Sequence, residues 1–115
     1  MTHMTIRIPI EKDDLIIPFT NQDLLRFIGG YRKEINDYVI GQLEDQDGGP
    51  HLSDFSISRL FHANNTCSFR LHFKIDRQFC CSDMLSCQMD YMDFIVNKSD
   101  KYTTLTGTYT TWTIQ

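Results

Sequence analysis

Residues 67–76 alternate without interruption between apolar and polar side chains. The apolar members are Cys67, Phe69, Leu71, Phe73 and Ile75, and the polar members are Ser68, Arg70, His72, Lys74 and Asp76. Because successive side chains of a β-strand point to opposite faces, this segment predicts a strand with one apolar and one polar face. Such strands are typical of antiparallel sheets that bury one face and leave the other in water. We therefore expect the core to form on one side of an antiparallel sheet.

Two further alternating segments come before this strand. Thr5–Ile10 contains Pro9, which lacks a backbone donor and so places this strand at a sheet edge. Residues 55–61 follow the same pattern, with Phe55, Ile57, Arg59 and Phe61 on one face. Asn64-Asn65 is expected to form the turn into the next strand, because asparagine tolerates left-handed backbone angles.

Two segments after it are also expected to be strands. Leu85–Val96 carries apolar residues on both faces, which indicates a central position, a bulge near Tyr91–Met92 or a surface covered by a partner. Tyr102–Ile114 is expected to be a long last strand with Gly107 as a bulge. One face of this strand carries four threonines, and we expect it to be the exposed face of an outer strand. These residues are Thr104, Thr106, Thr108 and Thr110.

A helical pattern occupies the first half of the chain. Thr20 with Asp23 three residues later predicts a capping box at its start. The apolar residues that follow at helical spacing are Leu24, Phe27, Ile28, Tyr31, Ile35, Tyr38, Val39 and Leu43. Gly29-Gly30 lies inside this stripe, so the helix is expected either to kink there or to divide into two helices.

The order of these elements predicts an α+β fold in a single domain spanning residues 1–115. We expect a strand, a helix and then a four-stranded antiparallel meander, with the helix packed on one face of a curved sheet. This order resembles the cystatin-like roll. The first hairpin reads Arg59-Leu60-Phe61-His62-Ala63-Asn64-Asn65 and lacks the inhibitory motif of cystatins, so the resemblance does not imply their activity.

No catalytic, metal or cofactor motif is present, and we expect neither an enzyme nor a cofactor. The four cysteines, Cys67, Cys80, Cys81 and Cys87, lack the spacing of a zinc site and are expected to be free thiols. His72 is expected to lie on the wet face of the sheet beside an acid such as Asp90. The sequence shows no secretory leader and no apolar run of the length that spans a bilayer, so we expect a cytoplasmic protein without membrane contact.

Charge provides the one functional signal. From Glu34 to Ser58 the chain has six acids and no lysine or arginine. Those acids are Glu34, Asp37, Glu44, Asp45, Asp47 and Asp54. Such a field repels nucleic acid and attracts basic proteins. We expect these carboxylates, with Tyr38 as an aromatic anchor, to form a surface for a basic protein partner.

In size, acidity and lack of motifs the chain is similar to the immunity proteins of bacterial contact-dependent inhibition and other polymorphic-toxin systems. This resemblance implies an inhibitor that covers the active site of a basic toxin domain, such as a nuclease. One alternative is a roll that binds a small ligand between helix and sheet, lined by Met84, Met89, Met92, Phe94 and Tyr109. Another is a homodimeric structural protein that associates through Leu85–Val96, so the chain is expected to be a monomer or a homodimer.

Overall fold

The computed structural model describes residues 3–9, 20–63, 66–79, 84–99 and 101–110. In chain order the elements are strand β1 (Met4–Pro9), helices α1 (Asn21–Gly29) and α2 (Arg32–Gln42), and strands β2 (His51–Ala63), β3 (Thr66–Phe79), β4 (Met84–Lys98) and β5 (Tyr102–Thr108). The expected turn at Asn64-Asn65, the pair Cys80-Cys81 and the end of the predicted last strand lie outside the described residues.

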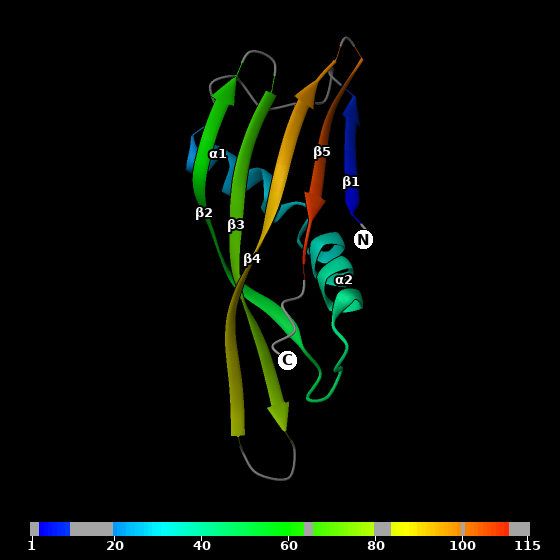
Figure 1. Ribbon diagram of the computed structural model, residues 1–115, viewed down its shortest axis with the longest axis vertical. Coiled ribbons are helices and arrows are strands. Elements are labelled where there is room, and N and C mark those ends of the chain that lie inside the picture. The colour runs from blue at the N-terminus through cyan, green and yellow to red at the C-terminus, as the bar shows by residue number, and fades with distance from the viewer. Residues whose placement is uncertain (1–2, 10–19, 64–65, 80–83, 100, 111–115) are drawn as a thin grey trace.

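The strands form one sheet in the order β1-β5-β4-β3-β2, and every neighbouring pair is antiparallel. The helices pack against one face of this twisted sheet (Figure 1), which confirms the expected α+β class and the meander of the last four strands. β1 is an edge strand, as Pro9 predicted, and it pairs with β5. The helices therefore connect the two opposite edges, β1 and β2. We call the helix-bearing side the covered face and the other side the open face.

The core consists of the apolar stripe of the helices against the covered face. Its helical members are Leu24, Ile28, Ile35 and Val39, and its main aromatic members in the sheet are Phe69, Phe73 and Phe94. The rings of Phe69 and Phe94 stack with centroids 5.2 Å apart across β3 and β4. β3 is buried at its odd-numbered positions from 67 to 75 and partly exposed at the positions between them. This pattern confirms the apolar face and the polar face that the sequence predicts.

The helical segment is divided into two helices. The predicted capping box is present at the start of α1: the Asp23 N–H donates to Thr20 Oγ1 at 3.0 Å, and the Thr20 N–H donates to Asp23 Oδ2 at 3.1 Å. This backbone hydrogen bond from Thr20 is the main reason why the pKa of Asp23 is lowered. Gly30 ends α1 and Tyr31 precedes α2. Nothing lies within 4 Å of a Cβ placed on Gly29, so no close helix crossing requires this glycine.

β2 departs from the predicted alternation because it contains two bulges. The register with β3 shifts between Ser53 and Ser56 and again between Ser58 and Phe61. Each bulge includes a residue with positive φ, Asp54 at 52° and Arg59 at 55°. The second bulge reverses the alternation, so Phe61 does not share the face of Phe55. Phe61 lies opposite Ser68 on the open face and is 64% exposed.

The bulge predicted at Gly107 and one of the alternatives for β4 are wrong. β4 pairs continuously with β3 through Tyr91 and Met92, so it has no bulge there, and it lies in the centre of the sheet, as another alternative predicted. On the open face it still carries two exposed apolar residues, Met89 and Ile95. Gly107 also pairs regularly, with Met4 on one side and Phe94 on the other. β5 is not an outer strand, since it lies between β1 and β4. Its described threonines at 104, 106 and 108 are half-buried on the open face.

Gly107 is required for packing rather than for a bulge. A Cβ at this position would lie 2.6 Å from Phe94 Cε1 and 2.7 Å from Met92 Cε, and both side chains are buried. We expect Gly107→Ala to lower the free energy of unfolding by about 1–3 kcal/mol, because the core must shift to admit the methyl group. Urea denaturation measures this change. Gly41→Ala is the control: this helical glycine has open space around it, so stability should stay the same or rise by up to about 1 kcal/mol.

Asp90 lies on the covered face, whereas His72 lies on the open face. The predicted pairing of these two residues is therefore wrong. The Asp90 carboxylate accepts a hydrogen bond from the Tyr109 hydroxyl at 2.5 Å and another from the Tyr91 N–H at 2.8 Å. The Tyr109 N–H donates to the Tyr38 hydroxyl at 3.1 Å. Tyr109 therefore connects the end of β5 to both β4 and α2. Burial, and then the hydrogen bond to Asp90, raise the pKa of Tyr109.

We expect Tyr109→Phe to destabilise the fold by about 1–3 kcal/mol, because the Asp90 carboxylate loses a partner on the covered face. Chemical denaturation at neutral pH gives the value. Tyr91→Phe is the matched control, since no hydrogen bond of the Tyr91 hydroxyl to a described residue is present and its ring lies on the open face beneath Arg70. Equal losses in the two variants would contradict the assigned role of the Tyr109 hydroxyl.

Candidate functional site

The acidic residues predicted to bind a partner lie on α2, on the loop after it and at the start of β2. Glu34 and Asp37 are exposed on α2, and Glu44, Asp45 and Asp47 are exposed on the loop of residues 43–50. Asp54 is exposed on β2 at the first bulge. We call the first five residues the acidic end. Glu34 and Asp37 are one turn apart, on the side of α2 opposite its buried Ile35 and Val39.

Hydrogen bonds fix the loop of the acidic end. The Gln46 side chain donates from Nε2 to the carbonyls of Ile40 at 2.7 Å and Leu43 at 2.9 Å, and so satisfies carbonyl groups at the C-terminus of α2. The Asp47 N–H donates to Asp45 Oδ1 at 2.8 Å and closes a local turn. Gly48 and Gly49 have φ values of 80° and 58°, which favour glycine at both positions.

The same loop is attached to the far end of β3. The Gln78 N–H donates to the Gly48 carbonyl at 2.8 Å, and Arg77 Nη1 donates to the Asp47 carbonyl at 2.7 Å. A Cβ on Gly48 would lie 3.0 Å from the Arg77 Cβ. The loop is therefore held between the end of α2 and β3, which places its carboxylates in a defined position.

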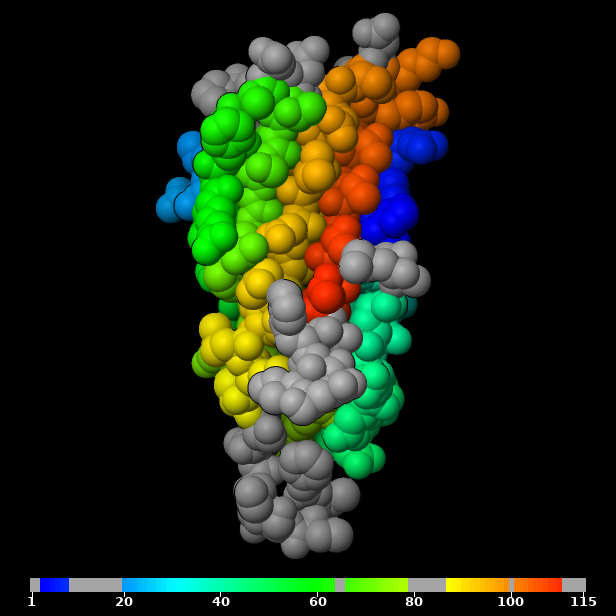
Figure 2. All heavy atoms as spheres, viewed as in Figure 1, coloured from blue at the N-terminus to red at the C-terminus, as the bar shows by residue number. Residues whose placement is uncertain are grey.

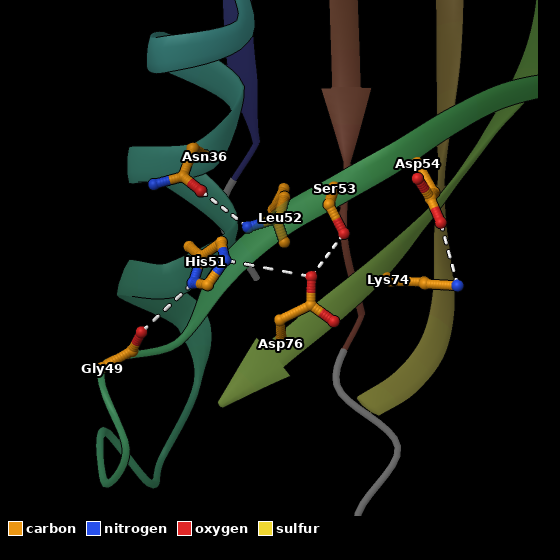
Figure 3. A network of polar contacts seen from close by, with 8 residues as sticks. All are labelled: Asn36, Gly49, His51, Leu52, Ser53, Asp54, Lys74 and Asp76. Atoms are coloured by element: carbon orange, nitrogen blue, oxygen red, sulfur yellow. Dashed lines mark hydrogen bonds and ion pairs between the residues drawn. The ribbon is translucent and has the colours of Figure 1, made fainter. Parts of the chain in front are cut away.

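The fold neutralises two of the six predicted acids. Lys74 Nζ lies 2.9 Å from Asp54 Oδ2 (Figure 3), and this contact raises the pKa of Lys74. Arg77 Nη1 lies 4.0 Å from Asp45 Oδ1. Within the described ranges, Glu34, Asp37, Glu44 and Asp47 form no ion pair. These four carboxylates carry the uncompensated charge of the acidic end.

Tyr38 lies on α2 with these acids, but its hydroxyl accepts the hydrogen bond from Tyr109 and its ring is half-buried against the core. The anchor role predicted for this residue stays a prediction. The structure gives Tyr38 an internal contact that the sequence did not indicate.

A second polar cluster joins α2, β2 and β3 next to the acidic end (Figure 3). The Ser53 hydroxyl donates to the Asp76 carboxylate, and His51 Nε2 lies 3.9 Å from Asp76 Oδ2. Asn36 Oδ1 accepts a hydrogen bond from the Leu52 N–H at 2.9 Å and attaches α2 to the edge strand. The Ser53 hydroxyl is the main reason why the pKa of Asp76 is lowered.

This cluster lacks the order of a catalytic triad. In a triad the serine donates to a histidine, which a carboxylate orients, whereas Ser53 donates directly to Asp76. On the open face, Ser58 Oγ and His72 Nε2 lie 2.5 Å apart, but no carboxylate of the described chain is hydrogen-bonded to His72. In the same part of the chain, no three side chains of histidine, cysteine, aspartate or glutamate are grouped to hold a metal ion. Both clusters connect strands.

The open face also carries a hollow that the sequence analysis missed. It has a volume of about 320 Å³ and is lined by Arg59, Ser68, Arg70, Asp93 and Ile95 among others. Only the paired strands bring these residues together, because they come from β2, β3 and β4. Met89, which was predicted to line a pocket under the helices, lies on the open face and is 61% exposed. Met92 and Phe94 are fully packed in the core.

Comparisons with known proteins add no relative: no family model, no curated protein and no solved structure matches the chain. Neither described helix has the length and apolar character needed to cross a bilayer. We therefore infer the function from the residues themselves.

The hydrogen bond from Ser53 predicts a pH-dependent contribution to stability. Because the pKa of Asp76 is lowered in the fold, its stabilising effect is present above the ordinary aspartate pKa of about 3.9 and is lost as the pH falls through the lowered value. We expect Ser53→Ala to raise the pKa of Asp76 and to reduce stability at pH 7 by about 0.5–1 kcal/mol, since this carboxylate is partly solvated.

NMR titration of the Asp76 carboxyl measures the pKa, and urea denaturation at pH 7 and at pH 2 measures the stability difference. The difference between wild type and Ser53→Ala should shrink at the lower pH. Ser56→Ala, an exposed serine on the same strand, should change neither quantity. A pKa of Asp76 that is unchanged in Ser53→Ala would show that another group lowers it.

Proposed function

We propose that this protein is a protein-binding module whose acidic end docks on a basic surface of a partner protein. The observation that carries the proposal is the set of four exposed carboxylates that form no ion pair with a described residue, at Glu34, Asp37, Glu44 and Asp47. Charges of one sign raise the rate at which an oppositely charged protein associates.

Preorganisation supports the same proposal. Hydrogen bonds from Gln46 and Arg77 hold the loop before any partner arrives, so binding would cost little further ordering of its backbone. α2 adds a rigid support: Glu34 and the end of the helix at Gln42 are separated by about 12 Å along its axis. The carboxylates of Glu34 and Asp37 thus lie on a rigid support, and those of the loop continue the surface beyond the end of the helix.

The partner class that fits this surface is a basic protein, and an acidic inhibitor of a basic toxin domain such as a nuclease is the specific form that we propose. In that form the carboxylates of the acidic end would occupy positions where the toxin binds phosphates. The exposed Lys33 beside Asp37 and the position of Arg32 at the start of α2 limit the acidic surface on that side. Arg32 itself is directed over the Phe55 ring at 4.7 Å.

We expect the combined variant Glu34→Gln, Asp37→Asn, Glu44→Gln and Asp47→Asn to slow association with the partner at least about tenfold at low salt, because it removes the steering charge. The partner would be isolated by affinity capture with the intact chain, and association rates would be measured at about 50 and 300 mM salt. The wild-type rate should fall with salt, and the rate of the variant should depend on salt much less.

A matched control adds the same charge elsewhere through Thr5→Lys, Gln22→Lys, Ala63→Lys and Asn97→Lys, all at exposed positions away from the acidic end. This control should retain most of the wild-type rate. The proposal fails if the captured partner is not basic, or if both quadruple variants slow association equally, because the effect would then reflect net charge alone.

A further inference from the structure

The second bulge of β2 creates an unusual row of side chains on the open face. Phe61 lies opposite Ser68, and Ser68 lies opposite Ile95, so a small residue separates two large apolar ones across three strands. Phe61 is 64% exposed and Ile95 is 51% exposed. Neighbouring strands are about 4.8 Å apart, so the backbones at Phe61 and Ile95 are about 10 Å apart, with only the small Ser68 side chain between them. This gap is wide enough for one inserted apolar side chain.

The hollow described above lies at this row. Its lining includes Ser68 and Ile95 from the row itself and Arg59 from the bulge, while Phe61 borders the row outside this lining. Figure 2 shows the same side of the sheet, where no helix covers the upper parts of β2, β3 and β4. The site is therefore open to a macromolecule.

Two arginines line the hollow, and the fold uses them differently. Arg70 donates from Nε to Asp93 Oδ1 at 2.8 Å and from Nη2 to Asp93 Oδ2 at 3.3 Å, and its guanidinium lies 3.8 Å above the Tyr91 ring. Its charge is therefore compensated. Arg59 is exposed and forms no ion pair with any residue that the structure describes. Within the described part of the chain, the hollow thus presents one cation without a carboxylate partner, next to the Arg70–Asp93 ion pair and the apolar side chain of Ile95.

Backbone strain accompanies this cation. Arg59 has a φ of 55°, a left-handed conformation that glycine or asparagine adopts far more readily than arginine. The bulge directs Leu60 to the covered face, where it packs against the core, and brings Phe61 to the open face. A glycine at position 59 would permit the same backbone without strain. The presence of an arginine is explained if its side chain contacts a ligand.

We propose that this hollow binds an acidic peptide segment of another protein. One apolar side chain of the segment would enter the gap above Ser68 between Phe61 and Ile95, and a neighbouring carboxylate would pair with Arg59. Charge complementarity favours an acidic occupant, and the openness of the hollow favours a peptide. This site is distinct from the acidic end, which lies at the α2–β2 junction and has the opposite charge, so each can fail independently of the other.

The test is an NMR titration of the full-length ¹⁵N-labelled protein with an acetylated and amidated octapeptide that contains three glutamates around one leucine. We expect shifts of the Ser68, Arg70 and Ile95 amides, and no binding of the same peptide with glutamines in place of glutamates. Arg59→Gln should weaken the affinity at least fivefold, whereas Arg7→Gln, which removes an exposed arginine of β1, should change it less than twofold.

Arg59→Gly separates an effect on binding from an effect on folding. It should weaken the affinity for the peptide as much as Arg59→Gln does, while the free energy of unfolding should stay equal or rise. Phe61→Ser should also weaken binding. The proposal is overturned if neither peptide shifts these amides, if both peptides bind equally, or if Arg59→Gln and Arg7→Gln have equal effects. It is overturned as well if these amides shift with protein concentration alone, because a second copy of the chain would then occupy the hollow.

Discussion

The continuous pairing of β3 with β4 is the constraint on which the rest of this structure depends. It runs without a register shift from Thr66 opposite Asn97 to Phe79 opposite Met84. A slip of one residue would move every apolar side chain of β3 to the open face, so the stack of Phe69 on Phe94 fixes this register. The helices then cover the one face that remains apolar, and the far end of β3 supplies Arg77 and Gln78 to hold the loop of the acidic end.

In the edge strand β2, a regular alternation of faces would not match the packing of its side chains. Regular alternation would place Phe55 and Phe61 on the same face, but only one of them packs against the core. Its two bulges accommodate this difference at the cost of positive φ values at Asp54 and Arg59. Bulges also disturb the row of unpaired backbone groups on an edge strand and so discourage pairing with another chain. The irregularity of β2 thus serves packing, edge protection and the shape of the hollow together.

In the described part of the chain, some charged residues form ion pairs and others do not. Asp54 and Asp45 face Lys74 and Arg77 from β3, while Glu34, Asp37, Glu44 and Asp47 are left to solvent. The two arginines of the hollow differ in the same way: among the described residues, Arg70 has a carboxylate beside it and Arg59 does not. Among the described residues, the acidic end therefore presents carboxylates without an ion pair, and the second bulge presents an arginine without one. We propose these two places as the functional surfaces of the molecule.

Local patterns in the sequence were enough to predict the class of the fold, the faces of β3, the edge position of β1 and the capped start of α1, because each depends on local periodicity or on one residue's backbone chemistry. The three-dimensional fold settles that Gly29-Gly30 divides the helix, that β1 pairs with β5, that Gly107 makes room for Phe94, and that Asp90 lies on the covered face. It also decided which acids keep an unshared charge and which side chains form the hollow. Those outcomes depend on contacts between residues far apart in the chain, and local patterns do not specify such contacts.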